Sequence, residues 1–144
     1  MDTVRVLFLC THNSSRSQMA EGFLRAVAPE RYEVASAGTE KRSVHPLAIR
    51  AMAERGIDIS GHTSKLFSDL PAARWDYLIT VCDDANERCP FVPGAVTRLH
   101  WSFEDPSRAT GSDEARLAVF RRVRDQIEAR IAQWLPALAA TTRT

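Results

Sequence analysis

Hydrophobic and polar positions along the chain fall into short blocks that switch between the periods of strands and helices. Near-continuous apolar runs predict buried strands at Val4–Leu9 and Trp75–Val81. Shorter apolar segments predict two more strands at Glu33–Ser36 and Thr97–Trp101. The intervening segments place apolar residues three or four positions apart, which predicts helices.

Three helices follow from this spacing and from the residues that bound it. Ser17–Val27 places Met19, Phe23 and Val27 on one face, and Pro46 opens a helix that runs to about Arg55 before Gly56. Asp113 and Glu114 suit the positive end of a long last helix. Its apolar stripe is Leu117, Phe120, Val123, Ile127, Ile131, Trp134 and Leu138, and the tail Ala139–Thr144 is predicted to fray.

The alternation of strands and helices indicates an α/β fold. We expect a four-stranded parallel sheet flanked by helices on both faces. The chain has 144 residues and shows no internal repeat, so we expect a single domain over residues 1–144.

Composition narrows the functional classes. Hydrophobic residues make up 44% and charged residues 26%, and the net charge of +1 gives no broad field for nucleic acid or an acidic membrane. Val4–Leu9 is too short to span a bilayer and lacks the features of a signal peptide, so we expect a cytoplasmic protein. Three cysteines in that compartment are expected to act as chemical groups rather than as fixed disulfides.

The segment between the first strand and the first helix has the pattern of an anion-binding loop. Backbone N–H groups turned inward, the helix N-terminus and the fork of Arg16 would together hold a tetrahedral oxyanion without a metal. The positive field of these groups favours the thiolate form of Cys10. Asn13 is of a residue type that tolerates the left-handed backbone conformation, which a sharply turning loop can require. The predicted binding residues are Thr11, His12, Asn13, Ser14, Ser15, Arg16 and Ser17. The alternative is an inert, buried Cys10 at a strand end.

Two further cysteines follow the third predicted strand. Cys82 ends that strand, so it should lie at the same sheet edge as Cys10, with Asp105 also near a strand end. Cys89 lies seven residues later; in a helix that spacing is about 10 Å of rise, whereas a disulfide needs Cα atoms roughly 4.4–6.8 Å apart. One interpretation is a redox switch, in which Cys82 and Cys89 form a disulfide when the segment between them unwinds. The alternative is that Cys82 is a small core residue and Cys89 a thiol without a function. A zinc site from Cys10, His12, Cys82 and Cys89 would lack the usual paired spacing.

The segment from Val6 to Gly22, VLFLCTHNSSRSQMAEG, resembles the low-molecular-weight tyrosine phosphatase superfamily. Three features resemble its thioredoxin-coupled arsenate reductase branch: Ser17–Ala20, where phosphatases carry a proline after the serine, Gly56–Ser60, and Trp101–Pro106. The resemblance implies the predicted four-stranded parallel sheet, wound as in flavodoxin-like folds, with a phosphate loop after the first strand. It covers the chain from Val4 to about Trp134.

The resemblance also implies roles for individual residues. Cys10 is the implied nucleophile and Asp105 the general acid, whose direction Pro106 restricts. Cys82 and Cys89 are the implied redox relay, regenerated by thioredoxin. Ser107 stands where phosphatases of this family carry an aromatic residue against phosphotyrosine. We expect arsenate as substrate with phosphate or sulfate as mimics, no cofactor or metal, and a monomer; the four histidines are assigned no catalytic role.

Some of the resembling reductases bind potassium beside the loop. The matching positions here are Asn13, Glu21, Ser36 and Thr63, but Lys65 stands where an acidic ligand would help. Its ammonium can take the place of the cation, so we expect no potassium requirement.

Two other functions fit part of the pattern. A phosphatase that hydrolyses phosphomonoesters through a Cys10 phosphoenzyme would use the same loop, Arg16 and Asp105, but would need neither Cys82 nor Cys89. An oxyanion-binding or redox-sensing regulator would keep the loop without needing Asp105. The sequence also leaves open whether thioredoxin, a glutaredoxin or a small thiol is the reductant.

Overall fold

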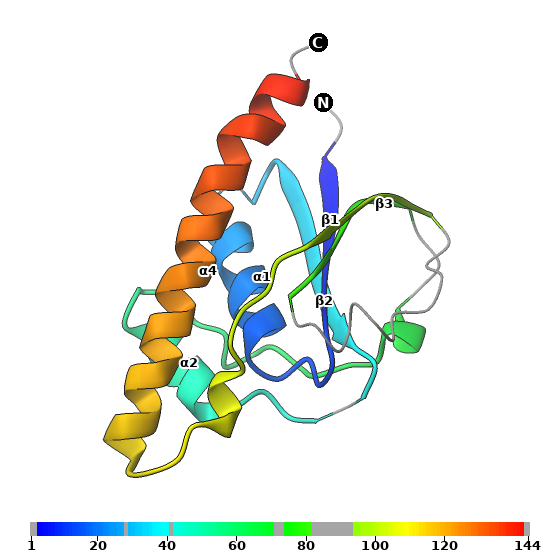
Figure 1. Cartoon of the computed structure of the whole chain (residues 1–144). Coiled ribbons are helices and arrows are strands. Elements are labelled where there is room, and N and C mark those ends of the chain that lie inside the picture. The colour runs from blue at the N-terminus through cyan, green and yellow to red at the C-terminus, as the bar shows by residue number, and fades with distance from the viewer. Residues whose placement is uncertain (1–2, 28, 41, 71–73, 82–93, 143–144) are drawn as a thin grey trace.

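The computed structural model describes residues 3–27, 29–40, 42–70, 74–81 and 94–142, with side chains as far as residue 135. Its strands are β1 (Val4–Cys10), β2 (Tyr32–Gly38), β3 (Trp75–Thr80) and β4 (Ala95–His100). Its α-helices are α1 (Arg16–Val27), α2 (Pro46–Ala53) and α4 (Asp113–Thr142), and two 3-10 turns are η1 (Phe67–Asp69) and η2 (Pro106–Arg108) (Figure 1).

The four strands form one parallel sheet in the order β2-β1-β3-β4, which confirms the predicted α/β architecture. β1 is a central strand, in which Leu7, Phe8 and Leu9 are completely buried. Its last residue, Cys10, pairs with Gly38 at the end of β2, and Leu9 pairs with Thr80 at the end of β3. The carboxyl ends of three strands therefore meet at one edge, the usual ligand edge of such sheets.

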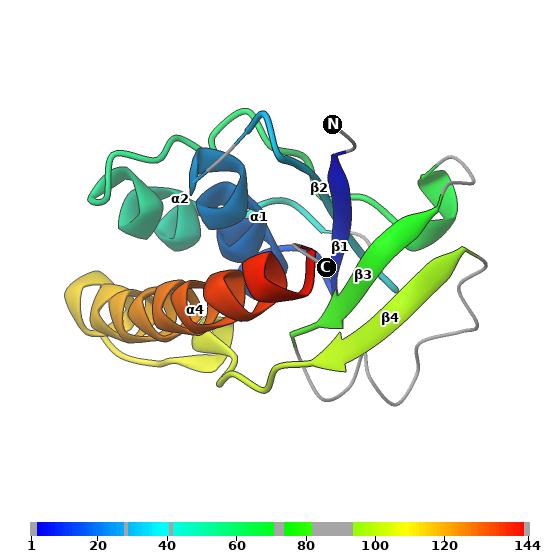
Figure 2. The same cartoon turned by 90° about the horizontal axis from the view of Figure 1, so that it is seen from above.

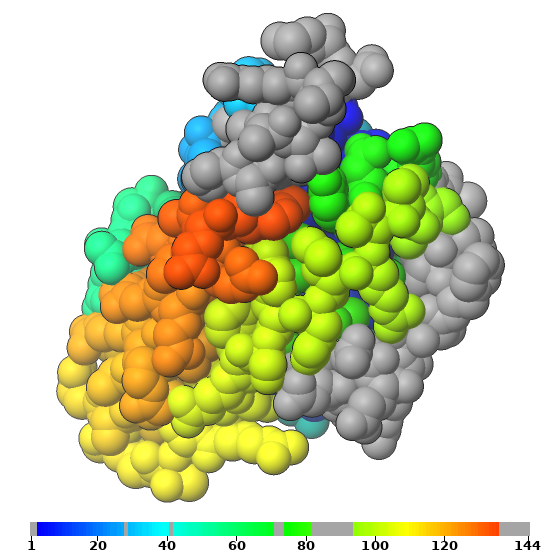
Figure 3. Space-filling view, turned by 45° about the horizontal axis from the view of Figure 1, so that its top comes forward, coloured from blue at the N-terminus to red at the C-terminus, as the bar shows by residue number. Residues whose placement is uncertain are grey.

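The described helices and turns lie on the two faces of the sheet. Helices α1, α2 and α4 lie together on one side, whereas η1 lies on the other (Figure 2). Strand β4 is one of the two edge strands of this sheet, and most of its residues are exposed; Figure 3 shows it at the surface beside α4. Within the described ranges, no helix is long and apolar enough to cross a membrane.

Most predicted element bounds agree with the structure to within one or two residues, but three details are wrong. Val27 is exposed because it lies at the very end of α1. Trp101 follows β4 instead of ending it, although its N–H still donates to Thr80 O over 2.8 Å. The tail was predicted to fray from Ala139, yet α4 continues to Thr142, because alanines at 137, 139 and 140 favour helix.

The long helix α4 has the predicted buried stripe, and Leu117, Phe120, Val123, Ile127, Ile131 and Trp134 are all buried. The side chain of the seventh predicted member, Leu138, lies outside the described part. The end of α2 agrees with the prediction as well, since Gly56 has a φ of 73°, a left-handed value suited to glycine.

An ionic cluster joins α2 to α4. Glu54, which caps α2, accepts hydrogen bonds from Arg121 (2.6 Å) and from the buried Arg124 (2.8 Å). Arg124 also donates to Ala51 O at 2.9 Å, so its charge is satisfied at the carbonyl end of α2. The hydrogen bond from Arg121 is the main reason why the pKa of Glu54 is lowered from 4.5 to about 2.

The lowered pKa of Glu54 predicts a pH dependence of stability. Because the carboxyl pKa is lower in the folded chain than the unfolded value of 4.5, the contribution is fully present above that value and disappears as the pH falls towards 2. Replacing Glu54 with Gln should flatten the free energy of unfolding over this interval, as measured by urea unfolding at several pH values. An unchanged slope in Glu54→Gln would contradict the assignment. Glu30→Gln, an exposed change outside the cluster, is the control.

Candidate functional site

The loop after β1 begins at a buried cysteine and ends at a helix N-terminus. Cys10 is the last residue of β1 and is 3% exposed, and α1 starts at Arg16. Between them, Asn13 has a φ of 49°, the left-handed conformation that its residue type was predicted to tolerate. The loop thus turns sharply and runs directly into the helix, as an anion-binding loop must.

The side chain of Asn13 holds this turn from inside the protein. Its amide nitrogen donates to Ser17 Oγ and to Ser36 Oγ, both over 2.9 Å. Its amide oxygen accepts from Gln18 Nε2 and from the backbone N–H of Lys65, both over 3.0 Å. Asn13 is fully buried, and these four bonds use both N–H donors of its side-chain amide and both lone pairs of the amide oxygen. The bonds connect the loop to α1, β2 and the segment that precedes η1.

Gly38 allows β2 to approach the loop closely. A Cβ at this position would lie 2.7 Å from Thr11 O and 2.9 Å from Asn13 N. The neighbouring Glu40 N–H donates to Thr11 O at 2.8 Å, so the loop backbone is also held from this side. Any larger residue at position 38 would displace the loop.

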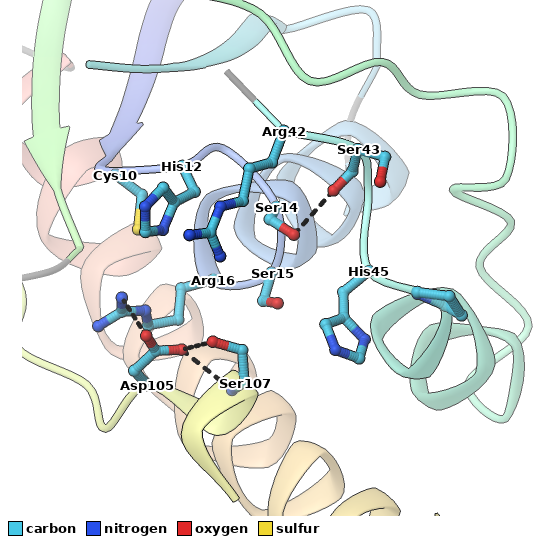
Figure 4. Close-up of a pocket in the computed structure, with 11 residues that line it drawn as sticks. Cys10, His12, Ser14, Ser15, Arg16, Arg42, Ser43, His45, Asp105 and Ser107 are labelled. Carbon is cyan, nitrogen blue, oxygen red and sulfur yellow. Dashed lines mark hydrogen bonds and ion pairs between the residues drawn. The ribbon is translucent and has the colours of Figure 1, made fainter. Parts of the chain in front are cut away.

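A cavity of about 410 Å³ opens above the loop (Figure 4). Cys10, Arg16 and Asp105 all line it, although they come from different parts of the chain. The other residues around it are His12, Ser14, Ser15, Arg42, Ser43, His45, Pro46 and Ser107.

The predicted binding residues separate into two groups. His12, Ser14, Ser15 and Arg16 line the cavity, whereas Thr11, Asn13 and Ser17 do not line it and are buried. Asn13 and Ser17 bond to one another and support the loop from behind. Cys82 and Cys89 lie outside the described residues.

Two buried polar groups of the loop have no hydrogen-bond partner in the described structure. They are Arg16 Nε and Ser15 Oγ, and both belong to cavity-lining residues. The other end of the guanidinium is engaged: Arg16 Nη1 donates to Phe103 O at 3.1 Å, and Nη2 lies 3.5 Å from Asp105 Oδ2. An unpartnered buried donor is costly, so the site is suited to an oxyanion that would accept from both groups.

Asp105 is held close to Arg16 by the turn that follows it. Its Oδ1 accepts from the N–H (3.0 Å) and the hydroxyl (2.7 Å) of Ser107, at the start of η2. Burial raises the pKa of Asp105, but the Ser107 hydroxyl and then the charge of Arg16 outweigh burial and hold the pKa below its usual value. Asp105 is therefore ionised at neutral pH when the site is empty.

Removing the Ser107 hydroxyl should raise the pKa of Asp105, because that hydroxyl makes the largest lowering contribution. The carboxyl titration in Ser107→Ala, followed by NMR, should move to higher pH than in the unchanged protein. Ser60→Ala is the matched control, since it removes an equivalent hydroxyl from Asp58 and should raise the pKa of that residue only. An unmoved Asp105 titration would show that the Ser107 hydroxyl does not hold the pKa down.

His45 was missed as a residue of the site. Its ring nitrogen Nδ1 accepts from Leu47 N at 3.1 Å and so caps α2. Its backbone N–H donates to Ser14 O at 3.0 Å, and the centroid of its ring lies 4.7 Å from that of Phe120. Burial and the charge of Arg116 lower its pKa. A polar residue directly before Pro46 was the available signal for a helix cap.

Arg42 and Ser43 were also missed, and no spacing in the sequence pointed to them. Each of the four histidines has a polar partner: Glu40 for His12, Leu47 N for His45, Gln18 for His62 and Thr80 for His100.

Two basic side chains, Arg25 and Lys65, lie beside the positions that match the potassium site of some resembling reductases. Glu21 accepts from Ser36 Oγ (2.6 Å) and from Arg25 (2.8 Å). Lys65 Nζ donates to Thr63 O at 3.2 Å, and burial lowers the pKa of this lysine. Two basic side chains therefore already contact the Glu21 carboxylate and the Thr63 carbonyl.

Comparison with known proteins agrees with this geometry. The family model described as low molecular weight phosphotyrosine protein phosphatase matches residues 5–144. An arsenate reductase of Shouchella clausii is 49% identical over 126 residues, which cover 88% of this chain and 91% of the relative.

Two solved structures are similar as well. One is an arsenate reductase in the phosphate binding state, with a TM-score of 0.77 and 35% identity, covering 94% of this chain and 98% of that chain. The other is a thioredoxin-dependent arsenate reductase from Corynebacterium glutamicum, with a TM-score of 0.72 and 32% identity, covering 96% of this chain and 63% of that chain.

Proposed function

The chain belongs to the low molecular weight phosphotyrosine protein phosphatase family, and we propose that it is a thioredoxin-coupled arsenate reductase. The main support for this function is that Cys10, Arg16 and Asp105 line one cavity, in a chain that is similar to arsenate reductases. Unpartnered donors on Arg16 and Ser15 make the cavity suited to a tetrahedral oxyanion.

In the first step, arsenate binds to the loop and the thiolate of Cys10 attacks arsenic. The backbone N–H groups, the helix N-terminus and Arg16 hold the oxygens and stabilise the charge that develops on them. A new S–As bond forms and an As–O bond breaks, and Asp105 gives a proton so that the oxygen leaves as water. Because Asp105 is ionised in the empty site, it must take up a proton when the dianion binds, which the negative charge of arsenate favours.

The redox steps use the two cysteines beyond β3. The Cys82 thiolate attacks the sulfur of Cys10, the S–As bond breaks, and its electron pair reduces arsenic(V) to arsenic(III), which leaves as arsenite. The Cys89 thiolate then attacks Cys82, so that the Cys10–Cys82 disulfide is exchanged for Cys82–Cys89 and Cys10 is released. The dithiol of thioredoxin reduces the last disulfide, and is itself oxidised.

Ser107 supports reduction rather than phosphotyrosine hydrolysis. Its side chain is small and is engaged with Asp105, so it offers no aromatic wall to a substrate ring. Arsenate-dependent oxidation of NADPH, in the presence of thioredoxin and thioredoxin reductase, tests the function directly. Hydrolysis of a chromogenic phosphate ester, measured in parallel, should be slow; rapid hydrolysis without arsenate reduction would overturn the proposal.

Replacing Cys89 with Ser should limit the enzyme to one turnover. The first two thiol steps remain possible, so about one arsenite per enzyme should form and a Cys10–Cys82 disulfide should accumulate. Arsenite quantification and peptide mapping under non-reducing conditions measure both outcomes. Cys82→Ser is the matched control and should yield no disulfide to Cys10. Sustained turnover of Cys89→Ser with thioredoxin would contradict the relay.

Activity should not depend on potassium. Lys65 and Arg25 already supply positive charge beside Thr63 and Glu21, so exchanging potassium for tetramethylammonium at constant ionic strength should leave the KM for arsenate unchanged. Lys65→Gln removes one of these charges and should make the rate rise with added potassium. A strong potassium requirement of the unchanged enzyme would contradict this prediction.

A further inference from the structure

Arg42 brings a second guanidinium to the cavity that holds Cys10 and Arg16. Figure 4 shows its side chain between His12 and Ser14, with the guanidinium inside the cavity. Among the hydrogen bonds and ion pairs of the described residues, none involves this side chain. The acid closest in sequence, Glu40, is engaged by His12 Nε2 at 2.9 Å.

The backbone around Arg42 is fastened to the oxyanion loop. Arg42 N–H donates to Ser64 Oγ at 3.0 Å, and the same hydroxyl donates to His12 O at 2.9 Å. The next residue, Ser43, accepts at its carbonyl from Ser14 Oγ over 2.8 Å. These bonds on both sides of the Arg42 side chain fix the point from which it reaches over the loop.

One oxygen of a tetrahedral oxyanion bound in this site would point towards Arg42. The loop and Arg16 can surround three oxygens of a tetrahedral oxyanion, while attack by Cys10 in line with the leaving group directs the fourth oxygen away from the sulfur. That oxygen faces the open side of the cavity. In arsenate or phosphate it is a hydroxyl or a charged oxygen, whereas in a phosphomonoester it carries the organic group.

We propose that Arg42 binds the outward oxygen of the inorganic oxyanion and so makes the site selective for arsenate and phosphate over phosphomonoesters. This assignment rests on the proposed oxyanion site. Arg16 carries one positive charge, which does not balance a dianion even after Asp105 has taken up its proton; the charge of Arg42 supplies the second positive charge. The bridging oxygen of an ester is uncharged and is a weaker acceptor, and its organic group competes with the arginine for the same space.

Binding of two small anions to the reduced protein tests whether Arg42 contacts the outward oxygen or acts only through its charge. Inorganic phosphate has an oxygen at the outward position, and phenylphosphonate has a phenyl ring there; at mildly alkaline pH both carry close to two negative charges. Calorimetric titration should show that Arg42→Gln weakens phosphate binding about 10-fold. Phenylphosphonate binding should change by less than about twofold, since it loses no hydrogen bond.

Control variants make the comparison specific. Arg31→Gln removes the same charge from an exposed arginine before β2, at the opposite end of the sheet, and should leave both affinities unchanged. Arg42→Lys keeps the charge without the planar fork and should recover part of the phosphate affinity. Thermal unfolding of each variant without ligand tests that the fold is kept, as expected for an exposed side chain.

Each outcome decides a separate point. Equal weakening of both anions by Arg42→Gln would show that Arg42 acts only through general charge and would overturn the selectivity. Unchanged phosphate binding would remove Arg42 from the site while leaving the proposed function standing. Absence of phosphate binding to the unchanged protein would instead overturn the proposed oxyanion site itself.

Discussion

The four hydrogen bonds of the Asn13 side chain are the constraint on which the rest of the site depends. They hold a left-handed turn that the backbone between β1 and α1 would not keep alone, and they do so from a fully buried position. With the turn fixed, the loop N–H groups and Arg16 are arranged before any ligand arrives. Such preorganisation is what lets donors stabilise developing charge without rearranging during the reaction.

The parallel sheet brings the residues of the site together from distant parts of the sequence. Parallel strands end at one edge, so Cys10 after β1 and the segment after β4 that carries Asp105 reach the same cavity despite their distance in sequence. Arg16 then connects them, with Phe103 O and Asp105 on one side and the loop on the other. Helices α1 and α2 both pack against α4, and the ionic cluster at Glu54 joins α2 to α4.

Much of this arrangement was predictable, for identifiable reasons. The apolar run of β1 and the stripe of α4 have clear periods, so their type and most of their bounds were correct. The oxyanion loop was found because Cys10 and Arg16 are separated by small polar residues between a strand and a helix. Errors fell at the ends, where the weaker signals of Val27, Trp101 and Ala139 depend on local packing or propensity. Cys82 and Cys89 lie outside the described residues, so their role as a redox relay stays a prediction.

The sequence by itself determined the order of strands and helices, the anion-binding character of the loop, and the candidate nucleophile and acid. These follow from local chemistry and from periods that a short window contains. Only the tertiary structure decided which side chains share the cavity, that Asp105 is ionised in the empty site through Ser107 and Arg16, and that Arg42 and His45 border the loop. Such facts depend on contacts between residues tens of positions apart, and no local pattern encodes those distances.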